Sequence, residues 1–90
     1  MNGYKNYEID LTGTASVSEF HERIRQGIPV PDYYGDNLDA LYDVLSSMRG
    51  RLIIKGSEVI DEDISDYIDK FRAMCSDVRG NNPLLEILFA

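Results

Sequence analysis

Residues 31–45, PDYYGDNLDALYDVL, are the most informative part of the chain, because here a short aromatic segment leads into an amphipathic helix. Pro31 has a fixed φ, and Gly35 can adopt a left-handed φ just before the regular pattern begins. Asp36 or Asn37 then offers a side-chain oxygen that can cap the first helical turn. Together these signals predict a loop followed at once by a helix.

The predicted helix has one apolar stripe. At about 100° per residue its members share a face and are expected to pack inward, and Gly50 is expected to end the helix. The stripe consists of Leu38, Leu41, Leu45 and Met48, with Val44 beside it.

A second, acidic stripe is expected on nearly the opposite side of this helix. Asp36, Asp39 and Asp43 are spaced i, i+3 and i+7, with Tyr42 beside Asp39, and no Lys or Arg occurs within residues 32–48. A polar outer face is what any surface helix shows, but like charges on one face repel each other. The stripe is therefore a candidate contact surface for a positively charged partner.

Two tyrosines precede the acidic stripe. Pro29 and Pro31 stiffen the segment before Tyr33 and Tyr34, so the two rings are delivered to a fixed place. A rigid ring with a polar tip is common at recognition surfaces. The aromatic segment is therefore grouped with the acidic stripe as one predicted site.

Length and charge restrict the class of protein. Ninety residues suffice for a single domain, here predicted over residues 1–90. The formal net charge of −7 argues against direct binding to nucleic acid or to an anionic membrane, because phosphate groups are bound by Lys and Arg. A basic protein is the better partner, and the chain is expected to be monomeric when free.

The cysteine count and the N-terminus predict a cytoplasmic protein. Cys75 is the single cysteine, so no intrachain disulfide can form, and its place on an apolar helical stripe predicts a buried thiol. Residues 1–8 lack the apolar core of a signal peptide, and no run approaches transmembrane length.

No cofactor or metal site is predicted. His21 is the lone histidine and is expected to be a packed side chain, because no second ligand or nucleophile is paired with it by spacing. The acidic cluster at 61–66 lacks the glycine and the terminal glutamate of a calcium loop, so a solvated helix start is expected there.

The rest of the chain predicts an α/β fold. Alternating or continuous apolar character predicts strands at 7–11, 52–54 and 84–89, of which 52–54 is expected to be buried on both faces. Helical periodicity predicts a helix at 16–27 and a longer one that starts at about 61 and carries Tyr67 on its apolar face. Gly80, Asn81, Asn82 and Pro83 are expected to break this longer helix, and a brief helical turn is predicted at 57–60. Strands separated by helices imply a three-stranded parallel sheet packed with about four helices in one compact layer.

The string PDYYGDNLDALYDVL closely resembles the segment by which members of the barstar family, intracellular inhibitors of ribonucleases, plug their target. The resemblance extends more weakly along the chain, through an opening strand, a helix with Phe20-His21, a middle strand and a late helix with Phe71-Arg72. It implies a barstar-like fold and competitive blockade of a microbial guanyl-specific, barnase-like ribonuclease or nuclease toxin, which is a basic secreted or toxin protein.

The resemblance also assigns roles to individual residues. Asp43 matches the family's phosphate-mimicking aspartate, Asp39 a second carboxylate that pairs with a basic residue, Tyr33 the loop aromatic, and Gly35 a backbone contact. Tyr42 stands where the family has a tryptophan. The predicted partner-binding set is Tyr33, Tyr34, Gly35, Asp36, Asp39, Tyr42 and Asp43, with a structural role as the alternative for Tyr34.

Two departures from the family pattern narrow this expectation. Ala73 follows Phe71-Arg72 where a glutamate adds to the contact, and Met48 replaces an aromatic residue. They put barnase itself in doubt as the target and leave the central plug intact.

Two other function classes remain as alternatives. An enzyme would need Asp39 and Asp43 to converge in a cleft, which an exposed helical face does not favour, so no catalytic residue is assigned. A non-inhibitory adaptor would use the same acidic face to bind a basic protein that is not a nuclease.

Overall fold

The structure, a computed structural model, describes residues 5–90. Residues 1–4 of the predicted domain 1–90 therefore lie outside the described residues. They are also half of the stretch 1–8 that was predicted not to be a signal peptide. The elements in chain order are β1 (Asn6–Asp10), α1 (Val17–Gly27), α2 (Leu38–Ser46), β2 (Gly50–Lys55), the 3₁₀ turn η1 (Glu62–Ile64), α3 (Ser65–Asn81) and β3 (Leu85–Phe89).

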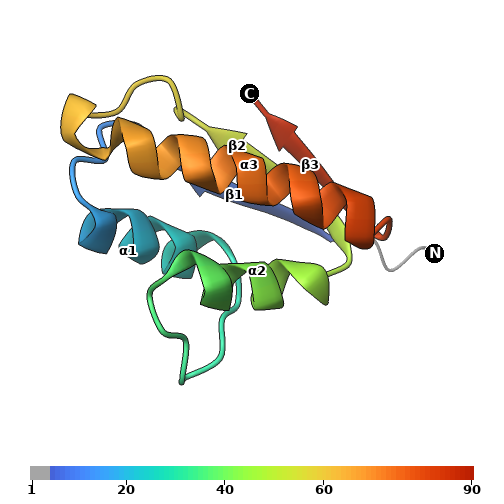
Figure 1. Cartoon of the computed structure of the whole chain (residues 1–90). Helices are drawn as coiled ribbons and strands as arrows, with labels where there is room; N and C mark the ends of the chain where they lie inside the picture. The colour runs from blue at the N-terminus through green and yellow to red at the C-terminus, as the bar shows by residue number, and fades with distance from the viewer. Residues whose placement is uncertain (1–4) are drawn as a thin grey trace.

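The sheet has three parallel strands, as the sequence predicts, and their order is β1-β2-β3 (Figure 1). Tyr7 on β1 lies opposite Leu52 on β2, which in turn lies opposite Ile87 on β3. The three α-helices lie on the same side of the sheet; in Figure 1, α3 crosses in front of the strands, and α1 and α2 lie below them. The α/β architecture is confirmed.

The prediction that the central strand is buried on both faces is wrong. Leu52 and Ile54 are fully buried under the helices, but Ile53 is half-buried on the opposite, open face. Ion pairs flank Ile53 there, from Lys55 to Glu8 and from Arg51 to Glu86, each at 2.9 Å. An apolar run of three residues does not show whether both faces of the strand will be covered, and within residues 5–90 no helix covers the second face.

The helix count differs slightly from the predicted four. Residues 57–60 are not helical: Val59 N–H donates to the Gly56 carbonyl at 3.0 Å, which closes a turn. The short helical piece comes later, at η1, where the Asp61 side chain accepts from the Asp63 N–H at 2.9 Å. The fold therefore has three α-helices and one 3₁₀ turn within residues 5–90.

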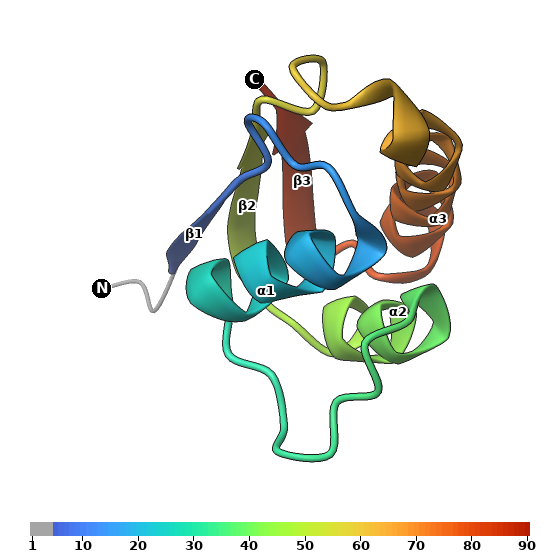
Figure 2. The ribbon, with the colours of Figure 1, turned by 90° about the vertical axis from the view of Figure 1, so that its left-hand side faces the viewer.

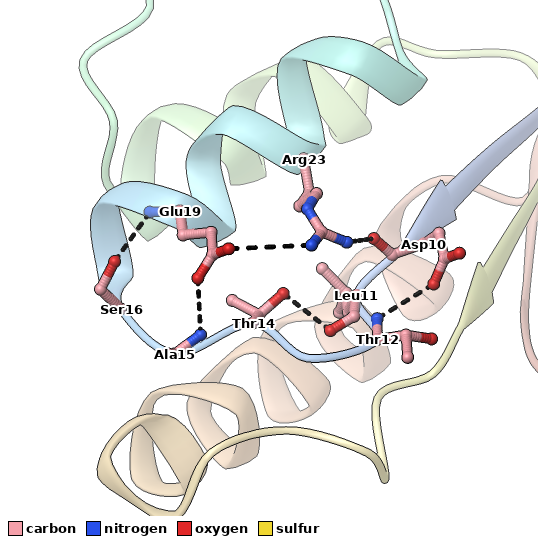
Figure 3. Close-up of polar contacts among 8 residues, drawn as sticks. All are labelled: Asp10, Leu11, Thr12, Thr14, Ala15, Ser16, Glu19 and Arg23. Carbon is pink, nitrogen blue, oxygen red and sulfur yellow. Dashed lines mark hydrogen bonds and ion pairs between the residues drawn. The ribbon is translucent and has the colours of Figure 1, made fainter.

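Helix α1 begins as the sequence predicts. The Ser16 hydroxyl accepts from the Glu19 N–H at 3.1 Å, while the Glu19 carboxylate reaches back to the Ala15 N–H at 2.8 Å (Figure 3). Arg23, one turn further on, donates to the Asp10 carbonyl at 2.7 Å and ties the helix to the end of β1. The cap and this tie fix the helix that carries His21.

Gly50 was predicted to end α2 and does not do so, whereas residues 80–83, predicted to break the late helix, do contain the end of α3. Helix α2 ends at Ser46, and Gly50 instead opens β2 with φ of +124°. Gly80 lies inside α3, which continues to Asn81. The helix ends where Asn82 precedes Pro83, because a residue before proline is kept out of the helical region.

The interior between sheet and helices is apolar and includes the thiol. Cys75 is buried, as predicted, and burial raises the pKa of its thiol to about 12. Phe20 from α1 and Phe71 from α3 meet edge to face at 5.0 Å and join the two helices. Among residues 5–90, no helix combines the length and apolar character that crossing a bilayer requires.

Candidate functional site

Helix α2 starts at the side chain of Asn37. Its Oδ1 accepts from the Ala40 N–H at 2.7 Å, which decides between the two predicted caps. Leu41 and Leu45 are fully buried, so the opposite side of α2 is turned to solvent. The far end of the helix is held by buried Asn82, whose Nδ2 donates to the carbonyls of Leu45 and Met48 at 2.9 and 2.8 Å.

Asp39 and Asp43 lie one helical turn apart on α2, and both are exposed. Two like charges at i and i+4 repel each other by about 0.2–0.5 kcal/mol. Within residues 5–90, neither carboxylate takes part in a salt bridge. The arrangement is ready to receive cations from outside.

Asp36 does not belong to the helical stripe, contrary to the prediction. It precedes α2, and its φ of 54° is the left-handed conformation expected of Gly35. Its carboxylate pairs with the Arg25 guanidinium on α1. Aspartate tolerates this backbone conformation better than most residues, since its short side chain can be held by a local partner.

Tyr33 is 88% exposed on the segment between α1 and α2, which projects from the body of the protein (Figure 2). An open groove of about 480 Å³ separates this segment from α2. Tyr33 and Pro31 line one side, and Asp43, Val44 and Met48 line the other. The site thus combines an exposed ring, an apolar floor and one carboxylate at the edge.

Tyr34 also lines the groove, but its hydroxyl points into the protein. It is buried, and its hydroxyl lies 2.7 Å from Nδ1 of His21. The second ring nitrogen of His21, Nε2, lies 2.7 Å from the hydroxyl of Tyr67 on α3. The lone histidine is therefore a packed side chain, as predicted. It is fully buried, and both of its ring nitrogens are hydrogen-bonded.

Burial of His21 predicts a pH dependence of stability. Desolvation, opposed by Asp36 and aided by Arg25, lowers the pKa of His21 below its ordinary 6.5, while Tyr34 and Tyr67 face it as neutral hydroxyls. Below pH 6.5 the unfolded state binds more protons than the native state, so the free energy of unfolding falls as the pH falls. The slope is at most about 1.4 kcal/mol per pH unit.

Urea unfolding at about pH 7.5, 6.5 and 5.5 measures this slope above the range where ordinary carboxylates titrate. A His21→Gln variant should show a flatter profile over the same interval. Equal slopes in the two proteins would show that His21 does not carry the dependence.

Three further positions concern the edges of the site. Tyr42 is half-buried, and its hydroxyl accepts from Asn81 Nδ2 at 2.8 Å, which ties α2 to α3. Met48 is half-buried at the groove. Ala73 is exposed on α3, so the structure places no carboxylate at that position.

The site offers little to a metal or to paired-carboxylate catalysis. Within residues 5–90, no group of three or more His, Cys, Asp or Glu side chains gathers as metal ligands would. Asp43 lines the groove but Asp39 does not, so the two carboxylates do not converge on one cavity.

Sequence reasoning missed the residues that position the site from behind. Tyr67 was assigned only to the apolar face of its helix, Asn82 only to a helix break, and Arg25 received no role. Their partners lie far along the chain, 46 residues away for the Tyr67–His21 contact and 37 for Asn82–Leu45. No local pattern signals such pairs.

Comparisons with known proteins identify related sequences. Residues 4–88 match the family model described as "Barstar (barnase inhibitor)". The chain is also 31% identical over 64 residues to a protein of Bacillus subtilis (strain 168) named "Putative ribonuclease inhibitor YrdF". That alignment covers 68% of this chain and 70% of the relative.

Proposed function

Since the chain belongs to the barstar family, we propose that it is an intracellular inhibitor of a ribonuclease and not itself an enzyme. The observation that carries the proposal is the exposed pair Asp39 and Asp43 on α2, beside the projecting ring of Tyr33. Such a surface is complementary to the cationic active site of an enzyme that binds RNA phosphates.

The proposed mechanism is blockade by phosphate mimicry. Asp43 enters the place of the scissile phosphate, where arginine, lysine and histidine donate charge-assisted hydrogen bonds to its two oxygens. A carboxylate presents no phosphodiester bond to cleave, so the enzyme is occupied and does not turn over. Asp39, one turn nearer the helix start, pairs with a cation at the rim.

The aromatic segment completes the proposed contact. The Tyr33 ring is solvent-exposed and has only two side-chain torsions to fix, so it can cover apolar surface on the enzyme at a small entropic cost. Gly35 contributes backbone contact, Tyr42 and Asp36 lie at the margin, and Tyr34 acts by holding the segment.

The target proposed is a guanyl-specific, barnase-like ribonuclease or the nuclease domain of a toxin. It is basic, because the inhibitor carries a net charge of −7 and opposite charges speed association. Ala73 lacks the late-helix carboxylate of the family pattern, so the contact is proposed to be centred on α2 and its preceding loop.

Titration of the protein against a panel of small microbial ribonucleases, with RNA cleavage as the readout, tests this proposal. We expect stoichiometric inhibition of at least one basic member, with an association rate that drops at least tenfold as salt rises from about 10 to 500 mM, because screening removes the steering. A Glu86→Gln variant removes one charge from the open face of the sheet and keeps the size of the side chain, so it shows what the loss of a charge away from the proposed contact does to the association rate.

Lack of inhibition across the panel would favour the adaptor. In that case a basic protein captured from the native cell extract by the acidic face should show no ribonuclease activity.

A further inference from the structure

The segment 28–37, between α1 and α2, has a single buried anchor in its outer part. Within residues 29–37, Tyr34 is the only side chain that is buried, at 6% exposure, while its neighbour Tyr33 is 88% exposed. The segment projects away from the helices and the sheet (Figure 2). Where Tyr33 points is therefore set largely by how firmly Tyr34 is held.

Tyr34 is held by a chain of hydrogen bonds that crosses the interior to another helix. Its hydroxyl bonds to Nδ1 of His21 on α1, and Nε2 of His21 bonds to the hydroxyl of Tyr67 on α3, each at 2.7 Å. A neutral imidazole has one N–H, so one tyrosine donates to the ring and the other accepts from it. Both ring nitrogens are thus used, and the imidazole is fixed from both sides.

We propose that Tyr67, which lies outside the proposed contact surface, is a positioning residue that holds the 28–37 segment in its binding geometry through His21 and Tyr34. The consequence for binding rests on the proposed function, whereas the effect on the segment does not. If the Tyr67 hydroxyl is removed, one nitrogen of a buried imidazole loses its partner, and the ring that anchors Tyr34 loses one of its two restraints.

A second tie from α1 supports the same segment. Arg25, one turn after His21, lies over the Tyr34 ring at 5.6 Å and pairs with Asp36. This ion pair is exposed and contributes little by itself. The buried chain through His21 is therefore the stronger restraint, and Tyr67 is its end.

The Tyr67→Phe variant isolates the hydroxyl. Phenylalanine keeps the edge-to-face contact of the ring with Phe20, which lies 5.4 Å away between centroids. By amide hydrogen exchange on the free protein, we expect the Tyr34 amide, whose N–H donates to the Pro31 carbonyl at 3.0 Å, to exchange at least about fivefold faster than in the unmodified chain, after normalisation to amides of β2.

An Ile87→Val variant serves as the matched control. It weakens the core at β3, away from the segment, and should speed exchange of the core amides of β2 and β3 more than that of the Tyr34 amide. Unchanged exchange at the Tyr34 amide in Tyr67→Phe would overturn the proposal, because the segment would then not depend on the hydroxyl. So would an acceleration of the same size in Ile87→Val.

Binding provides the second readout, with barnase as the first probe and the rest of the ribonuclease panel after it. Tyr67→Phe should weaken binding about threefold to tenfold, mainly through faster dissociation, and this loss should shrink to less than about twofold when Tyr33 is already alanine. An undiminished loss in the Tyr33→Ala background would show that Tyr67 does not act through the position of Tyr33.

The two proposals fail separately. If the unmodified chain binds none of the ribonucleases, the proposed function fails, and the exchange measurement still decides whether Tyr67 holds the segment.

Discussion

Replacement of Asp43 by alanine is expected to weaken inhibition more than any other single change on α2, by roughly 30-fold or more in Kd. Asp43 is exposed and lies at the edge of the groove that Tyr33 faces, so it is the carboxylate best placed to enter a cationic cavity. Once desolvated among several donors, its loss removes their shared acceptor and leaves those cations unpaired.

The same substitution should not destabilise the free protein. It relieves repulsion from Asp39 and places a better helix former within α2, so the free energy of unfolding should stay equal or rise by up to about 1 kcal/mol. Urea unfolding and a binding titration on one preparation measure the two effects together. A residue that lowers stability and raises affinity is one kept for contact.

The controls rank the other positions of the site. Asp39→Ala and Tyr33→Ala should follow Asp43→Ala in effect, and Asp36→Ala should change Kd by less than about threefold because its exposed carboxylate already pairs with Arg25. Asp43→Asn keeps the size and should lose most of the binding as well. If Asp36→Ala weakens binding more than Asp43→Ala does, the assigned geometry is wrong.

Gly50→Ala is expected to cause a large loss of stability, about 3 kcal/mol or more, and to leave much of the chain unfolded. Gly50 opens β2 with φ of +124°, and a Cβ at this position would collide with the carbonyl oxygen of Lys5. That carbonyl accepts from the Arg51 N–H at 2.9 Å, so the side chain would force apart the start of the β1–β2 pairing. The unfavourable φ and the overpacking each contribute about 1–3 kcal/mol.

Gly80→Ala is the matched control. Gly80 is helical and exposed, and nothing lies within 4 Å of the Cβ it would gain. An alanine there should leave stability unchanged or raise it by up to about 1 kcal/mol. Thermal or urea unfolding of both variants checks the pair, and a Gly50→Ala protein as stable as Gly80→Ala would contradict the close approach of β1 to β2.

The contrast between these glycines shows where local pattern reading stops. Gly50 was predicted to end its helix, and Gly80 was predicted to begin the break at residues 80–83, since glycine after an apolar helical stripe is a usual stop. Gly50 is instead required by a neighbouring strand, and Gly80 continues a helix that Pro83 ends from three positions further on. Glycine marks a need for backbone freedom or space, and the sequence does not say which.

The acidic stripe shows a similar limit. The i, i+4 spacing of Asp39 and Asp43 was enough to place both on one exposed face once α2 formed. Asp36 left the stripe because Asn37 supplied the cap and Arg25, from another helix, paired with its carboxylate. Whether Asp36 lies on the same face as the helical residues therefore depends on which of two adjacent side chains, Asp36 or Asn37, forms the N-cap.

The sequence pattern predicts the alternation of helices with parallel strands, the apolar face of α2 and the exposure of its carboxylates, because hydrophobic periodicity and helix capping act between residues a few positions apart. Tertiary structure alone decided that His21 joins Tyr34 to Tyr67, that Asn82 holds the end of α2, and that one side of the sheet stays open. Those outcomes depend on which surfaces meet after the chain folds back on itself, and a helical or strand period specifies a face but not its partner.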